Sequence, residues 1–193
     1  MLKAVAFNGS PRKDGNTETL LKMVLEEIKS EGISTELIQV GGKAIRGCSA
    51  CMKCRKNMNT RCAIDSDELN SYIEKALKAN IIIIGSPTYF ADVSSETKAL
   101  IDRLGFVARA NGLLKDKIGA AVVAVRRAGA VHVFNTINNF FMINSMLVVG
   151  STYWNLGFGK AKGDVQKDSE AVENMKDLGK RIALLSKKIY AGS

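Results

Sequence analysis

Histidine, proline and tryptophan are scarce in this sequence, which has one His, two Pro and one Trp among 193 residues. The single histidine, His132, excludes multi-histidine metal sites and leaves one candidate base for a Ser-His-Asp triad. No stretch approaches the ~18 consecutive apolar residues of a membrane-spanning helix. The apolar run at the N-terminus ends at Asn8-Gly9, which is too early for a secretory signal. We therefore expect a cytoplasmic protein that does not enter a membrane.

Acidic residues are in the minority, with 19 Asp and Glu against 28 Lys and Arg and a formal net charge of +9. A surplus of this size suggests nucleic acid as a partner. However, the surplus is concentrated between positions 41 and 64, where six basic residues and no acidic residue occur, leaving +3 for the rest of the chain. These six are Lys43, Arg46, Lys53, Arg55, Lys56 and Arg61. Because this stretch has no aromatic residues and the chain no helix-turn-helix pattern, we expect no nucleic-acid partner.

The overall composition is that of an ordinary globular protein, with 46% hydrophobic and 24% charged residues. No run rich in Pro, Gly or Ser divides the chain. We therefore predict one domain over residues 1–193, with residues 41–64, which show no hydrophobic period, inserted as a cysteine-rich loop.

Short apolar strands alternate with amphipathic helices along the chain. The strands are predicted at 4–7, 34–40, 81–84, 118–125 and 146–149, and the helices at 17–31, 65–77, 96–107, 133–143 and 168–190. Asp65 or Ser66 is the expected cap of the second helix. Strands that are apolar without alternation belong to parallel sheets covered on both faces. The pattern predicts a flavodoxin-like, doubly wound α/β fold with a five-stranded parallel sheet in the order 2-1-3-4-5.

The first and third predicted strands are each followed by the tripeptide Gly-Ser-Pro, at Gly9-Ser10-Pro11 and Gly85-Ser86-Pro87. Both could simply be turn signals, but the predicted strand order places them on either side of the crevice where such sheets bind ligands. The first loop leads into a helix and matches neither a Walker A loop nor a dinucleotide-binding motif. Its polar residues suit one phosphate group of a mononucleotide. They are Ser10, Arg12, Asn16 and Thr17.

The second loop carries adjacent aromatic residues, and these suit the edge or face of a flat ring. Its candidate ligand-binding residues are Pro87, Thr88, Tyr89 and Phe90. Packing of Tyr89 or Phe90 against a neighbouring subunit is an alternative, and the two roles are compatible.

All four cysteines lie between positions 48 and 62, which is typical of a metal or redox site rather than of a disulfide framework. Cys48, Cys51 and Cys54 have C-x-x-C-x-x-C spacing, and Cys62 follows after seven residues. This spacing favours an iron–sulfur cluster. Zinc and free thiols or a disulfide are the alternatives. The surrounding basic residues favour thiolates or an anionic cluster in each case.

These motifs together resemble those of the iron–sulfur flavoproteins, within the wider NADPH-dependent FMN reductase family. The resemblance rests on Gly9-Ser10-Pro11-Arg12 with Thr17, on the four cysteines, and on Ser86-Pro87-Thr88-Tyr89-Phe90 with the segment from Lys98 to Arg103. It implies FMN held by the first loop at its phosphate and by the second at its isoalloxazine ring. It also implies a third contact at Arg126, Arg127 and Gly129, a 4Fe–4S cluster on Cys48, Cys51, Cys54 and Cys62, and a homodimer or homotetramer.

The expected function is that of an FMN-dependent oxidoreductase. It would take electrons from NAD(P)H or reduced ferredoxin and pass them through FMN, and through a 4Fe–4S cluster where one is present, to a small-molecule or protein acceptor. The alternative is a non-enzymatic electron carrier or redox sensor with the same cofactors. Because a flavin carries the chemistry itself, no catalytic side chain is assigned, and His132 is interpreted as structural.

Overall fold

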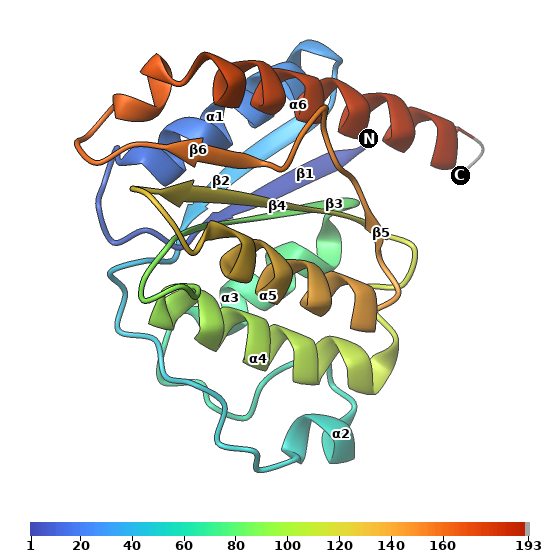
Figure 1. Cartoon of the computed structure of the whole chain (residues 1–193). Helices are drawn as coiled ribbons and strands as arrows, with labels where there is room; N and C mark the ends of the chain where they lie inside the picture. The colour runs from blue at the N-terminus through green and yellow to red at the C-terminus, as the bar shows by residue number, and fades with distance from the viewer. Residues whose placement is uncertain (192–193) are drawn as a thin grey trace.

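The computed structural model describes residues 1–191 and places a parallel β-sheet between two layers of helices (Figure 1). The main strands follow the order β2-β1-β3-β4-β5, which confirms the doubly wound topology predicted from the sequence. The strands are β1 (Lys3–Asn8), β2 (Ser34–Gln39), β3 (Ile81–Pro87), β4 (Ile118–Val125), β5 (Leu147–Val148) and β6 (Leu156–Phe158).

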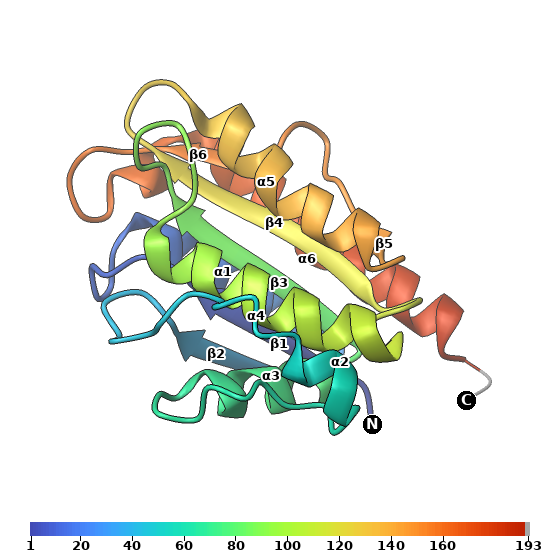
Figure 2. The same cartoon turned by 90° about the horizontal axis from the view of Figure 1, so that it is seen from below.

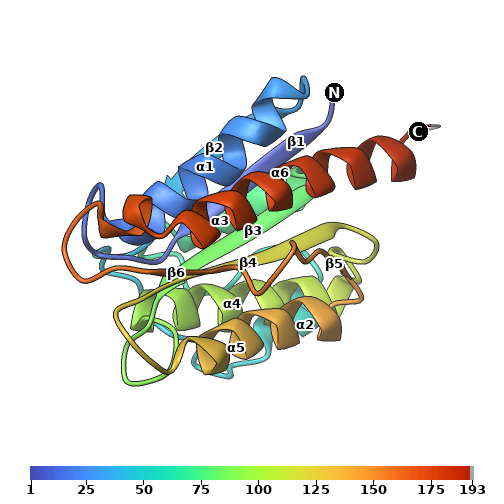
Figure 3. The same ribbon diagram turned by 45° about the horizontal axis from the view of Figure 1, so that its top comes forward.

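Helices cover both faces of the sheet (Figures 1 and 3). On one face lie α1 (Asn16–Ser30) and α6 (Ser169–Ile189), and on the other α3 (Leu69–Lys78), α4 (Ser95–Asn111) and α5 (Ala130–Ile143). A short 3₁₀ helix, Asp164–Lys167, precedes α6. The central strands are apolar throughout because alternate residues enter different cores: Ile82 and Ile84 face the three-helix layer, while Ile81 and Ile83 face the other. Within residues 1–191, no helix combines the length and the apolar character needed to cross a membrane.

The fifth strand departs from the sequence prediction of one strand at 146–149. The edge strand is split in two, and both parts pair with β4: β5 at Ile118 and Gly119, and β6 from Val123 to Val125. The intervening loop carries the exposed Tyr153 and Trp154. Strand β6 was not predicted because a three-residue strand is too short to show a period.

The second predicted helix, 65–77, also begins later than expected. The residue before α3 is Glu68, so Asp65 and Ser66 do not cap it. Asp65 instead accepts a hydrogen bond from the Asn70 side chain at 2.9 Å. Asp67 accepts one from the Leu69 amide at 3.1 Å and so supports the first turn. A short helix, α2 (Lys53–Asn57), was not predicted and lies against α4 (Figure 2).

Glu36 on β2 accepts two lysine side chains, with Lys3 Nζ at 2.7 Å and Lys75 Nζ at 2.6 Å. Hydrogen bonds from these lysines hold the pKa of Glu36 below its ordinary value of 4.5. The stabilisation is therefore present above that value and is lost as the pH falls through the lowered pKa. We expect Glu36→Gln to reduce the free energy of unfolding by about 1 kcal/mol at neutral pH, because the group is only partly exposed. Urea denaturation against pH should show this difference vanishing in acid.

Glu74→Gln is the matched control, since within residues 1–191 the one ion pair of Glu74 is with Lys78, at an exposed i,i+4 position. Its effect on the free energy of unfolding should be small at every pH. An equal loss in both variants would contradict a special role for the Glu36 bridge.

Candidate functional site

A cavity of about 330 Å³ opens at the carboxyl ends of the parallel strands, at the point where the strand order reverses. The two Gly-Ser-Pro loops meet beside it, and the Gly9 amide donates to the Gly85 carbonyl at 2.8 Å. The cavity brings together most of the residues predicted from the sequence. Those residues are Ser10, Arg12, Asn16, Thr17, Pro87, Thr88, Tyr89 and Arg126.

Two amide side chains, the buried Asn8 and the half-buried Gln39, fix the start of the first loop. Asn8, at the end of β1, donates from Nδ2 to Gln39 Oε1 at 2.7 Å and accepts the Ser10 amide on Oδ1 at 3.1 Å. Gln39 Nε2 in turn donates to the carbonyls of Ser10 and Gly41, both at 2.7 Å. The main chain at Ser10 is therefore held between the ends of β1 and β2 before any ligand binds.

The first turn of α1 has the features of an anion-binding site. Gly15 is the N-cap residue and provides no side-chain acceptor, so the first N–H groups of α1 keep free hydrogen-bonding capacity. Among the described residues, neither the Thr17 hydroxyl nor the Arg12 guanidinium has a partner. Thr17 is buried and Arg12 is exposed at the rim. These donors suit a phosphate group at one end of the cavity.

Asn16 lines the cavity, but its side chain is engaged elsewhere. Its Nδ2 donates to the Ala161 carbonyl at 2.9 Å, and its Oδ1 accepts the Gly163 amide at 2.9 Å. Asn16 thus holds the loop that follows β6 against the cavity. This loop adds Gly159 and Lys160 to the lining, two residues that the sequence analysis missed. Their only signal would have been the basic, glycine-containing stretch itself, because β6 was not foreseen.

The aromatic loop after β3 forms a tight turn. Tyr89 and Asp92 exchange backbone hydrogen bonds of 2.9 and 3.0 Å, and between them Phe90 and Ala91 have φ values of 49° and 60°. Left-handed backbone at both central positions is the pattern of a type I′ turn, which normally selects Asn or Gly. Two non-glycine residues in this conformation indicate stored strain of the kind that clusters at functional sites. The turn leaves Phe90 fully exposed at its tip.

The residues predicted to make the third FMN contact line two different cavities. Arg126 lines the cavity with Pro87, whereas Arg127 and Gly129 line a neighbouring one of about 360 Å³ with Tyr153 and Trp154. Gly129 has a φ of 86°, and a Cβ there would lie 2.9 Å from Ala91 Cβ. The lack of a side chain at Gly129 thus lets the aromatic loop pack closely against the start of α5.

All four cysteines border one small hollow of about 20 Å³ beside α4. They are free thiols, and Cys51 is the most exposed. Across residues 1–191, no three His, Cys, Asp or Glu side chains converge closely enough to hold a metal ion. The four sulfur atoms thus lie around one hollow but do not converge closely enough to bind a single metal ion.

The loop backbone around Cys51 favours thiolate. A hydrogen bond from the Lys53 amide is the main cause that lowers the pKa of the Cys51 thiol, and a hydrogen bond from the Ser49 hydroxyl lowers it further. Ala50 and Met52, on either side of Cys51, have φ values of 52° and 57°. Thiolate is the form that binds metals and iron–sulfur clusters.

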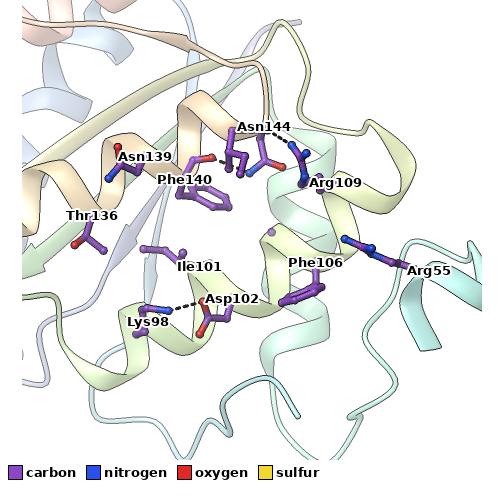
Figure 4. Close-up of a pocket in the computed structure, with 12 residues that line it drawn as sticks. Arg55, Lys98, Ile101, Asp102, Phe106, Arg109, Thr136, Asn139, Phe140 and Asn144 are labelled. Carbon is purple, nitrogen blue, oxygen red and sulfur yellow. Dashed lines mark hydrogen bonds and ion pairs between the residues drawn. The ribbon is translucent and has the colours of Figure 1, made fainter. Parts of the chain in front are cut away.

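A larger groove of about 520 Å³ runs between α4 and α5 (Figure 4). Its basic side chains are already engaged: Lys98 pairs with Asp102 at 2.5 Å, and Arg109 donates to the Ile143 carbonyl at 2.6 Å. Arg55 lies over the Phe106 ring, 5.8 Å from its centroid. Phe106 also borders the cysteine hollow, so the groove and the hollow are neighbours.

Residues 2–161 match the family model of NADPH-dependent FMN reductases. The chain belongs to this family. FMN is therefore its cofactor, and its chemistry is flavin-based oxidoreduction. The cavity fits this cofactor, because it offers uncapped helix donors at one end and an aromatic loop at the other.

Relatives in this family include iron–sulfur flavoproteins of archaea. The chain is 37% identical to an iron–sulfur flavoprotein of Methanocaldococcus jannaschii, over 97% of this chain and 99% of that protein. It is 31% identical to one of Methanosarcina thermophila, over 94% and 93% of the two chains. Among solved structures, RosB with a bound riboflavin phosphate intermediate shares the fold, with a TM-score of 0.73, 20% identity, and coverage of 97% of this chain and 81% of RosB.

Proposed function

We propose that this FMN reductase family member takes electrons from NAD(P)H or reduced ferredoxin and passes them through FMN to a small-molecule or protein acceptor. The observation that carries the proposal is the difference between the two ends of the 330 Å³ cavity, with anion-binding donors at one end and the aromatic loop at the other. Thr17 and the first turn of α1 would hold the FMN phosphate, while Pro87, Thr88 and Tyr89 would border the isoalloxazine ring. When bound, FMN supplies both hydride and single-electron chemistry.

We further propose that the cysteine-rich loop holds a 4Fe–4S cluster on Cys48, Cys51, Cys54 and Cys62. The four thiols border one hollow and none is consumed in a disulfide, which supports this assignment. The hollow is only about the size of one water molecule, so the loop bearing the first three cysteines has to open to receive a cluster. Soft thiolate donors in a basic surrounding suit an anionic iron–sulfur centre.

Helix α4 connects the two proposed sites. At its start, Ser94 Oγ donates to the Gly9 carbonyl of the first loop at 2.7 Å. Further along, Arg103 and Phe106 border the cysteine hollow. At 1.5 Å per residue, Arg103 lies about 12 Å along the helix from Ser95. A rigid element thus sets the spacing between flavin and cysteines within one chain.

Iron, acid-labile sulfide and FMN measured on anaerobically purified protein test the cofactor content. We expect about four iron and four sulfide per FMN if the cluster assignment is correct. Stoichiometric zinc, or FMN with neither iron nor sulfide, would refute it.

Turnover separates the enzyme from the carrier. Steady oxidation of NADPH or reduced ferredoxin with an added acceptor supports the enzyme. Reduction of the bound flavin by a single equivalent of the electron donor, with no turnover for any acceptor, would favour the alternative of an electron carrier or redox sensor.

A further inference from the structure

Arg103, on the buried side of α4, is the largest side chain that is fully buried in the described part of the protein. Its guanidinium makes four hydrogen bonds. Nε donates to Cys62 Sγ at 3.3 Å, and Nη2 donates to the Ile64 carbonyl at 2.7 Å. Nη1 donates to the Arg46 carbonyl at 3.0 Å and to Asp67 Oδ2 at 2.5 Å.

These acceptors lie at both ends of the cysteine segment, defined here as residues 47–63. Arg46 comes directly before the segment and Ile64 directly after it. The same two ends have further ties: Asp67 Oδ2 accepts the Arg46 amide at 3.1 Å, and Asn70 Nδ2 donates to the Ile64 carbonyl at 3.1 Å. Asn70 also accepts the Cys62 amide at 2.9 Å. The segment is therefore closed at its base by protein groups alone.

The four cysteines differ in how firmly they are held. Cys62 is fixed through its amide, its carbonyl and its sulfur. The loop bearing the other three contains residues in the left-handed region, among them Ala50 and Met52. Among the described residues, Cys62 is thus the one cysteine whose sulfur accepts a hydrogen bond from outside the segment, because the Cys48 sulfur accepts the Ala50 amide and the Cys51 sulfur accepts the Lys53 amide.

We propose that Arg103 is a positioning residue that closes the base of the cysteine segment and presents the Cys62 sulfur, through an N–H···S hydrogen bond, as the first ligand of the cluster. The inference rests on the proposed function for its cluster half only. A planar guanidinium can serve four acceptors at fixed angles, which an ammonium group cannot. Asp67 balances the charge, so the buried arginine is not left unpaired. Hydrogen bonds to ligand sulfurs also raise the reduction potential of an iron–sulfur cluster.

Hydrogen exchange on the FMN-loaded, iron-free protein tests the closure. Arg103→Lys keeps the charge but loses the planar set of guanidinium donors. We therefore expect hydrogen exchange at the amides of Arg46 and Cys62 to rise by about tenfold or more. Strand β3 (Ile81–Pro87) serves as the internal reference and should not change. Arg109→Lys is the matched control, because Arg109 lies on the same helix, is exposed and has one carbonyl acceptor. Unchanged exchange at the segment base, or an equal rise in β3, would overturn the closure.

The cluster half is tested by the midpoint potentials of the two centres in anaerobic protein. In Arg103→Lys the iron–sulfur potential should become more negative, while the flavin potential stays that of the wild type. A cluster retained at an unchanged potential would overturn this half. Absence of iron and sulfide from the wild type would instead refute the proposed cluster, and the exchange measurement would still decide the closure.

Discussion

Gly41→Ala is expected to lower the free energy of unfolding by about 3 kcal/mol and to weaken FMN binding by about tenfold or more. A Cβ at Gly41 would lie 2.3 Å from the Ser10 carbonyl carbon and 2.5 Å from the carbonyl oxygens of Gly9 and Ser10. All three are main-chain atoms, so no side chain can rotate away to make room. The loop that moves is the one proposed to hold the FMN phosphate. Chemical denaturation of the apoprotein and quenching of flavin fluorescence measure the two effects.

Gly150→Ala is the control for this substitution. Gly150 is exposed, and a Cβ there would meet no atom within 4 Å. Its effect on stability should stay within about 0.5 kcal/mol. If Gly41→Ala behaved like Gly150→Ala, the close approach of the two loops would not matter to folding or to the cofactor.

Thr17→Val should weaken FMN binding by about 10- to 100-fold while leaving riboflavin binding unchanged. Thr17 is almost wholly buried in the uncapped first turn of α1 and lines the cavity, and its hydroxyl has no partner among the described residues. Valine has nearly the same shape, so the change removes one hydrogen bond to a charged group, worth about 1.5–3 kcal/mol. Riboflavin lacks the phosphate and should not sense the loss. Equilibrium titrations with both flavins provide the comparison.

Thr19→Val controls for the loss of a hydroxyl from the same helix. Thr19 Oγ1 already donates to the Gly15 carbonyl at 3.1 Å, within its own helix. We expect little change in the affinity for either flavin. Equal weakening of FMN and riboflavin in Thr17→Val would place the phosphate elsewhere.

The strand order and the place of the cavity both follow from patterns in the sequence. Uninterrupted apolar strands such as 118–125 can lie only in a sheet covered on both faces, and that sheet binds ligands where its strand order reverses. Ser10, Thr17 and Tyr89 were therefore predictable, because each lies in a loop or first helical turn that directly follows a strongly patterned strand.

The remaining residues of the candidate site depend on how distant elements pack together. Gly159 and Lys160 follow a strand too short to show a period. Asn16 lines the cavity, but its side-chain amide is bonded to the loop around Ala161. Arg103 looks like any helical arginine in the sequence, yet it joins residues far away along the chain. Hydrophobic period and turn residues are local properties, whereas hydrogen bonds across such separations depend on which elements pack together. The cysteine spacing therefore indicated a redox segment, but only packing against α4 assigned it a buried arginine.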